Sequence, residues 1–129
     1  MPSILITGAS SGIGRATTQK FLNEGWHVGL LARRADKLSE IADGNQKAAI
    51  FPVDVTDRVA VDQAISEFAN SCGRLDAVFN NAGVFPSGAV VDEITDEDWL
   101  TTVNVNLTGM FYTARAAFAQ MRKQTPQGG

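Results

Sequence analysis

Residues 3–14 of the chain read Ser-Ile-Leu-Ile-Thr-Gly-Ala-Ser-Ser-Gly-Ile-Gly, an apolar run followed by a glycine-rich turn. The run predicts a buried strand, and the pattern after the turn predicts a helix over residues 13–23. Glycines let an anion approach the backbone, while a helix start offers free N–H groups and a positive dipole end. The stretch therefore predicts a phosphate-binding turn whose contacting residues are Gly8, Ser10, Ser11, Gly12, Ile13 and Gly14. A tight turn without a ligand is the alternative, and the position between strand and helix disfavours it.

Short apolar runs and helical patterns alternate along the rest of the chain. Strands are expected at residues 4–6, 28–32, 48–53 and 75–79, and helices at residues 13–23, 35–42 and 57–72. Thr95 is the expected N-cap of a long last helix, with Asp98 at the reciprocal capping position, and this helix ends before Pro126. This alternation predicts an α/β fold with one domain over residues 1–129, built on a doubly wound parallel sheet with helices on both faces.

The composition of the 129-residue chain is that of a globular protein, with 44% hydrophobic and 19% charged residues. A net charge of −3 argues against nucleic acid and anionic membranes as partners. Cys72 is the only cysteine, so an intrachain disulfide is excluded. The N-terminal residues resemble neither a signal peptide nor a transmembrane helix, and these features together predict a cytoplasmic protein. No metal site is expected, because the acidic residues at 92–93 and 96–98 surround a helix start, where acids are favoured.

The end of the second predicted strand distinguishes two dinucleotide cofactors. An NAD site places an acidic residue there to bind the ribose 2′-hydroxyl, whereas an NADP site uses arginine. The sequence reads Leu-Ala-Arg-Arg at residues 31–34 and has no acid before Asp36. Arg33 and Arg34 therefore favour a 2′-phosphate and predict NADP rather than NAD as the cofactor. The alternative is that both arginines form the solvated start of a helix.

Four motifs, taken in order, resemble those of the short-chain dehydrogenase/reductase family. Residues 7–14 resemble its T-G-x-x-x-G-x-G cofactor motif, and Asp54-Val55 resembles its adenine contact. Residues 80–83, Asn-Asn-Ala-Gly, resemble its N-N-A-G signature, and residues 106–109, Asn-Leu-Thr-Gly, resemble the helical segment that carries a catalytic asparagine. The resemblance implies a Rossmann-like fold with Asn106 in the catalytic set, and it adds as cofactor-binding residues Asp54, Val55, Asn80, Ala82 and Gly83.

Two of these assignments have structural alternatives. The carboxylate of Asp54 can instead cap the helix that begins near Asp57. An asparagine in mid-helix competes for backbone hydrogen bonds, so a position facing solvent is the alternative for Asn106. Helical spacing favours an inward position for Asn106, on a face that it shares with Trp99, Val103 and Met110.

The family resemblance implies an oxidoreductase that transfers hydride between a nicotinamide cofactor and a small carbonyl or alcohol substrate. The acid/base of the family is the tyrosine of a Tyr-x-x-x-Lys motif. The only tyrosine here is Tyr112, and Ala116 stands four residues later, so this motif is absent from the chain. We therefore expect a truncated, N-terminal part of a family member. Its sheet is expected to be incomplete at the C-terminal side, where the glycines at 128–129 lead into a fifth strand.

A catalytically inactive, truncated nucleotide-binding module is the alternative function. Another doubly wound domain, such as a methyltransferase, is disfavoured by the glycine spacing and by the Asn-Asn-Ala-Gly turn. The truncation also leaves the strand at residues 75–79 as an open edge and one side of the last helix without partners. That side predicts self-association into a homo-oligomer, and its residues are Phe111, Ala114, Phe118 and Met121.

Overall fold

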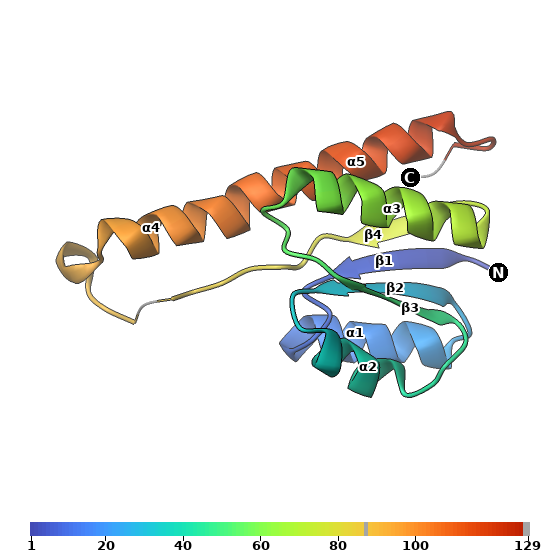
Figure 1. Ribbon diagram of the computed structural model, residues 1–129, viewed down its shortest axis with the longest axis horizontal. Coiled ribbons are helices and arrows are strands. Elements are labelled where there is room, and N and C mark those ends of the chain that lie inside the picture. Colours follow the sequence, from blue (N-terminus) through green and yellow to red (C-terminus); the bar gives the residue numbers. More distant parts are fainter. Residues whose placement is uncertain (87, 128–129) are drawn as a thin grey trace.

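Four parallel strands form the middle layer of the computed structural model, which describes residues 1–86 and 88–127 (Figure 1). Their order is β3-β2-β1-β4, with the bounds Ser3–Thr7 for β1, His27–Ala32 for β2, Ala48–Pro52 for β3 and Ala77–Phe79 for β4. In the register, Ile4 of β1 lies between Val28 of β2 and Ala77 of β4. The chain builds the sheet outward from β1 in both directions, so β1 lies at a topological switch point.

Helices cover both faces of this sheet (Figure 1). The helices α1 (Gly12–Asn23) and α2 (Ala35–Ala42) lie on one face, and α3 (Arg58–Cys72) and α5 (Met110–Lys123) lie on the other. Beyond the sheet lie a 3₁₀ turn, η1 (Val91–Glu93), the helix α4 (Asp96–Val103), and a π-helix that joins α4 to α5, η2 (Asn104–Gly109). The predicted Rossmann-like, doubly wound arrangement is thereby confirmed. None of the helices in the described part of the chain has the length and apolarity needed to span a bilayer.

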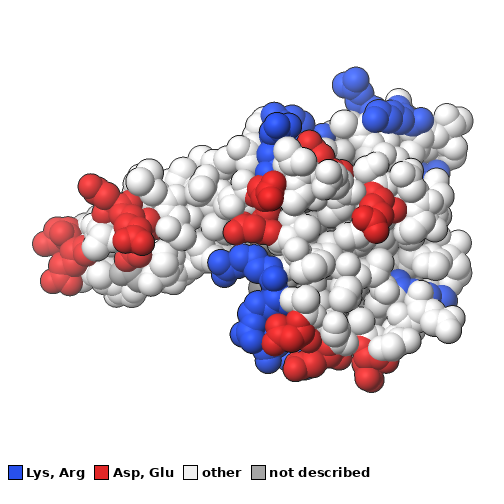
Figure 2. All heavy atoms as spheres, in the orientation of Figure 1, with Lys and Arg blue, Asp and Glu red and all other residues white. Residues whose placement is uncertain are grey.

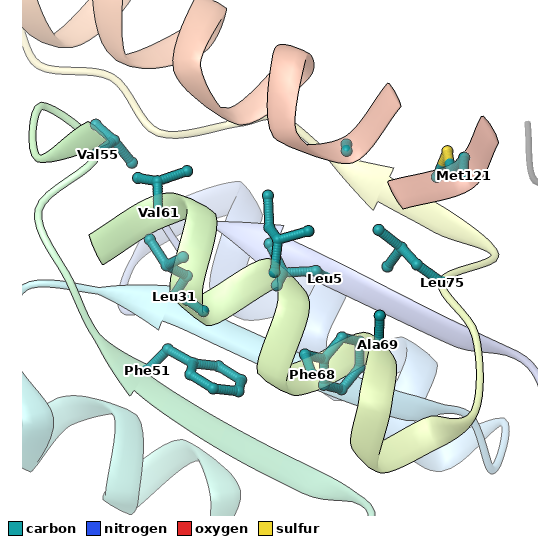
Figure 3. Close-up of a cluster of buried hydrophobic side chains, with 12 residues drawn as sticks. Leu5, Leu31, Phe51, Val55, Val61, Phe68, Ala69, Leu75 and Met121 are labelled. Atoms are coloured by element: carbon teal, nitrogen blue, oxygen red, sulfur yellow. The ribbon is translucent and has the colours of Figure 1, made fainter. Parts of the chain in front are cut away.

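The strands contribute side chains to two hydrophobic cores, one on each face of the sheet. Leu5 lies in the core beneath α3 and α5, whereas its neighbours Ile4 and Ile6 lie in the core above α1 and α2. Figure 3 shows the first of these cores, where Phe68 of α3 and Met121 of α5 lie with Leu5. Burial on both faces explains why the strands read as continuous apolar runs.

The last strand is shorter than predicted, since it begins at Ala77 and not at residue 75. The backbone N–H of Leu75 donates to Oε1 of Gln124 at 2.7 Å, and Nε2 of Gln124 donates to the Leu75 carbonyl at 2.9 Å. These bonds join the chain before β4 to the end of α5. On the side that faces β1, the N–H of Ser3 donates to Oδ2 of Asp76 at 2.9 Å, so a side chain takes the place of a backbone acceptor where the strand would extend. The predicted lead into a fifth strand at residues 128–129 lies outside the described residues.

The side of α5 that was expected to lack partners is only partly open. Phe111 and Phe118 are 54% and 69% exposed, in line with the prediction. The prediction is wrong for Met121, which is buried in the same core as Leu75 because it points toward α3 and the sheet. A groove of about 600 Å³ lies between β4 and α5 and is lined by Val78, Ala117 and Phe118 among others. Self-association through this side stays a prediction.

Candidate functional site

A cleft of about 160 Å³ lies at the edge of the sheet where the strands end. Its lining is Gly8, Ser10 and Ser11 after β1, Leu31 to Arg34 at the end of β2, Val53 to Val55 after β3, Ala82 to Val84 after β4, and Val105 of η2. Doubly wound sheets bind their ligands in this crevice, outside the carboxyl ends of the strands and at the switch point. The fold therefore brings most of the predicted cofactor-binding residues to one place.

Some predicted residues do not line the cleft, and some lining residues were not predicted. Gly12, Ile13, Gly14, Asn80 and Asn106 are absent from the lining. The lining residues that the sequence did not reveal as site residues are Leu31, Ala32, Val53, Val84 and Val105. These are apolar residues within two positions of a predicted polar or glycine residue. That proximity in sequence is the signal by which they can be found.

The glycine turn packs directly against the loop that follows β4. A Cβ on Gly14 would overlap the carbonyl oxygen of Gly8 and lie 2.7 Å from Nδ2 of Asn81. A Cβ on Gly8 would lie 2.9 Å from the Cα of Ala82, and Gly8 also has a φ of +66°. Only glycine fits at both positions, so the turn sequence is required by packing as well as by any approaching ligand.

Thr7, at the end of β1, joins the glycine turn to the loop after β4. Its Oγ1 accepts hydrogen bonds from the backbone N–H groups of Asn81 and Ala82, each at 2.9 Å. In return, Nδ2 of Asn81 donates to the carbonyls of Thr7 and Gly8 at 3.2 and 3.4 Å. Thr7 and Asn81 thus fix the two walls of the cleft relative to each other, a role that was not predicted for Thr7.

The start of α1 lies next to the cleft and has no side-chain cap. Ser11 is the N-cap residue, yet its side chain makes no capping hydrogen bond, and the first turn contains no acidic residue. The first N–H groups of a helix have no acceptor within the helix. Because Ser10 and Ser11 line the cleft, this helix end has the donors and the dipole to hold an anion there.

Two arginines line the cleft at the end of β2. Nη2 of Arg34 lies 3.0 Å from Oδ2 of Asp36, and both side chains are largely exposed. The hydrogen bond from Arg34 lowers the pKa of the Asp36 carboxyl below its ordinary value. Within residues 1–86 and 88–127, no carboxylate pairs with Arg33. The first of the two guanidiniums is therefore available to a ligand, and the second is shared with α2.

Asp54 lines the cleft after β3 and does not cap α3. Its Oδ1 accepts from the backbone N–H of Thr56 at 3.0 Å and from the Thr56 hydroxyl at 2.8 Å. The N-cap of α3 is Asp57, whose carboxylate accepts from the N–H of Ala60. The structural alternative for Asp54 is thus wrong, since the capping position is already filled by Asp57.

Asn106 holds the loop that follows β4. Its Oδ1 accepts from the backbone N–H of Val84 at 2.7 Å, and its Nδ2 donates to the Val84 carbonyl at 2.8 Å. Nearby, Nδ2 of Asn80 donates to the carbonyl of Met110, the first residue of α5, at 2.9 Å. The amides of Asn106 and Asn80 therefore connect the wall of the cleft to the junction of η2 and α5. These contacts confirm the inward position of Asn106.

The helical face predicted to point inward with Asn106 is nevertheless mostly open. Trp99 is 61% exposed and Met110 is 44% exposed. Trp99 lies on α4, which extends past the sheet (Figure 1), and Met110 is the first residue of α5. Close packing begins at Gly109, where a Cβ would lie 2.7 Å from Cγ2 of Val55. Gly109 thus lets the helix approach the residues that line the cleft.

Charge is distributed unevenly over the molecule. Figure 2 shows acidic side chains gathered at the free end of the arm formed by α4, and a mixture of basic and acidic side chains on the body of the molecule. The acidic group includes Asp96, Glu97 and Asp98 in the first turn of α4. Among the described residues there is no cluster of His, Cys, Asp and Glu that fits a metal ion.

Residues 2–129 match the family model described as short chain dehydrogenase. The chain belongs to this family. It is 37% identical over 123 residues to an uncharacterized oxidoreductase of Staphylococcus aureus, a match that covers 94% of this chain and 53% of the relative. The chain thus spans about half the length of the curated relatives it matches.

Two solved structures of similar fold contain different cofactors. One is ElxO with NADP bound, 29% identical with a TM-score of 0.88, where the match covers 98% of this chain and 52% of the other. The second is NAD⁺-bound xylitol dehydrogenase, 28% identical with a TM-score of 0.90, where the match covers 98% and 50%. Because both cofactors occur on this fold, a preference between them has to come from the residues of this chain.

Proposed function

We propose that this chain, as one domain over residues 1–129, forms the cofactor-binding part of an oxidoreductase that prefers NADP. The reaction is hydride transfer between the nicotinamide and a small carbonyl or alcohol. The observation that carries the proposal is the single cleft that combines the open start of α1 with Arg33, Arg34 and Asp54. The bound nicotinamide supplies the hydride chemistry. The residues of the chain bind the dinucleotide and orient it.

The residues of the cleft suit the parts of a dinucleotide. The N–H groups of Gly12, Ile13 and Gly14, with the hydroxyls of Ser10 and Ser11, are proposed to hold the pyrophosphate. Oδ2 of Asp54 is proposed to accept from the adenine amino group, with Val55 beside it, because Thr56 already occupies Oδ1. The residues after β4 are proposed to lie along the nicotinamide ribose, and these are Asn80, Ala82 and Gly83.

We propose that Asn106 contributes to the catalytic set through position. Both polar groups of its side chain are bonded to the backbone of Val84, and Val84 lines the cleft. Replacing Asn106 would therefore release this wall of the cleft. In this proposal Asn106 keeps the cofactor loop in place while other groups exchange the proton with the substrate.

The preference for NADP is proposed to depend on Arg33. A phosphate monoester carries about −1.5 to −2 charges at pH 7, and arginine binds such a group through paired N–H donors. The position before Arg33 is Ala32, so no carboxylate stands there to repel the phosphate. Arg33 lines the cleft and is exposed, which leaves its guanidinium accessible to a 2′-phosphate.

Equilibrium titrations with NADPH and NADH test this function. We expect the chain to bind NADPH more tightly, and Arg33→Ala to weaken NADPH binding about tenfold or more, the size of a charge-assisted hydrogen bond, with NADH binding unchanged. Arg122→Ala, which removes the same charge from the end of α5, is the matched control and leaves both affinities unchanged. Equal affinities for the two cofactors in the unmodified chain would contradict the preference, and equal losses in Arg33→Ala would contradict the role of Arg33.

We further propose that the protein works in the cytoplasm as a homo-oligomer. The exposed Phe111 and Phe118 on α5 support the second part, since an apolar surface of this kind is typical of an interface. Sedimentation velocity checks it directly: a mass close to the monomer value at micromolar concentration would contradict the proposal.

A further inference from the structure

The ion pair between Arg34 and Asp36 lies at the rim of the proposed cofactor site. Arg34 is one of the two arginines that line the cleft, and its Nη2 is 3.0 Å from Oδ2 of Asp36. Asp36 stands in the first turn of α2. Asp36 thus lies two residues beyond Arg34, and its carboxylate occupies one N–H donor of that guanidinium.

This carboxylate competes with a phosphate for the same partner. Carboxylate and phosphate both bind a guanidinium through its fork of N–H donors, so a donor used by Asp36 is lost to the phosphate until the pair opens. Arg33 has no such competitor among the described carboxylates.

We propose that Asp36 limits the preference for NADP by occupying Arg34, so that Arg33 alone provides a free guanidinium for the 2′-phosphate. This inference rests on the proposed function, because it presumes an NADP site at the end of β2. It assigns the two neighbouring arginines different roles. Arg33 selects the 2′-phosphate, and Arg34 binds the carboxylate of Asp36 in place of the phosphate.

A purely structural role for Asp36 makes a different prediction. An acid in the first turn of a helix is favoured by the dipole, whatever ligand binds nearby. In that case the removal of its charge lowers the stability of α2 and leaves the choice between cofactors unchanged. Measurements of affinity for both cofactors separate the two roles.

The test compares Asp36→Asn with Glu40→Gln in titrations with NADPH and NADH. Glu40 lies one turn further along α2 and pairs with Lys37, so its variant removes the same charge without contact to Arg34. We expect Asp36→Asn to tighten NADPH binding relative to Glu40→Gln by up to about fivefold, the upper end of the range for an exposed ion pair, with NADH unchanged. In a chain that also carries Arg34→Ala, the Asp36→Asn change is expected to give no gain.

The outcomes distinguish this inference from the function on which it rests. Equal effects of Asp36→Asn and Glu40→Gln on NADPH binding overturn the role of Asp36, even where the unmodified chain prefers NADPH. The same holds if Asp36→Asn tightens both cofactors alike, or if its gain persists without Arg34. If the unmodified chain binds both cofactors equally while Asp36→Asn selectively tightens NADPH, the role of Asp36 stands and the preference proposed for the unmodified chain fails.

Discussion

The starts of α1 and α4 differ in whether a side chain accepts a hydrogen bond from their free N–H groups. At α4, Oγ1 of Thr95 accepts from the N–H of Asp98 at 3.1 Å, and the first turn carries three acids, Asp96, Glu97 and Asp98. At α1, Ser11 makes no capping bond and the first turn contains no acid. A serine and a threonine thus occupy equivalent positions, and only the threonine acts as a cap.

The difference separates a helix whose start is capped by its own residues from a helix whose start has no side-chain cap. The cap and acids of α4 compensate its dipole from within, and this helix projects away from the sheet into solvent (Figure 1). The α1 start forgoes a capping bond of about 0.5–2 kcal/mol, and the two serines that precede it, Ser10 and Ser11, line the cleft. A local rule of helix stability is broken at the candidate site and kept elsewhere, which is typical of functional positions.

The largest effect on cofactor binding and stability is expected from a substitution at the third helical residue. Gly14 occupies this position in α1 and Asp98 in α4. We expect Gly14→Ala to abolish NADPH binding and to lower the free energy of unfolding by about 1–3 kcal/mol, because the added Cβ meets the carbonyl of Gly8. Titration calorimetry and urea unfolding measure the two effects. Gly88→Ala is the control, since a Cβ there meets no atom within 4 Å, and it leaves binding and stability unchanged. Normal NADPH affinity in Gly14→Ala would show that the turn does not need this packing.

The next largest effect is expected when the start of α1 receives an acidic residue like those at the start of α4. In Ser11→Asp a carboxylate stands where the pyrophosphate is proposed to bind. We expect NADPH and NADH affinity to fall together by at least about tenfold, since like charges a few ångströms apart repel strongly. The favourable interaction with the dipole raises the free energy of unfolding by about 0.3–1 kcal/mol.

The control for this change puts the same side chain at the other helix. Thr95→Asp keeps a capping oxygen at α4 and is expected to leave the affinity for both cofactors unchanged. The decisive observation is opposite signs in Ser11→Asp, with higher stability and weaker binding. Unchanged cofactor binding in that variant would mean that the start of α1 holds no phosphate.

The parts of the site that the sequence predicted are the local ones. The glycine turn, the arginine pair and Asp54 each follow directly after a strand, and parallel strands bring their ends to one edge of the sheet. A strand pattern and a glycine spacing are therefore sufficient to assemble this part of the cleft. The same reasoning correctly placed the cap at Thr95, where a threonine precedes a run of acids.

The parts that the sequence did not predict depend on contacts between distant residues. At the start of β4, the Asp76 carboxylate accepts from the N–H of Ser3, 73 residues away, and Leu75 pairs with Gln124, 49 residues away. The two hydrogen bonds between Asn106 and Val84 come from a side chain in the π-helix η2, and no periodicity in the sequence predicts a π-helix there. The ion pair of Arg34 with Asp36 depends on a choice of side-chain rotamer. Each requires the tertiary fold or a rotamer that residue spacing does not determine.

Removing the cap of α4 has the smallest expected effect and isolates stability from binding. Thr95→Ala deletes the hydroxyl that accepts from Asp98 and is expected to lower the free energy of unfolding by about 1 kcal/mol. Thr101→Ala, on an exposed position of the same helix, is the matched control and is expected to change it by less than about 0.5 kcal/mol. NADPH affinity stays unchanged in both variants, because α4 lies outside the cleft. A weaker affinity in Thr95→Ala would show that the two helix starts are coupled, so that capping at α4 supports the cofactor site through η2 and Asn106.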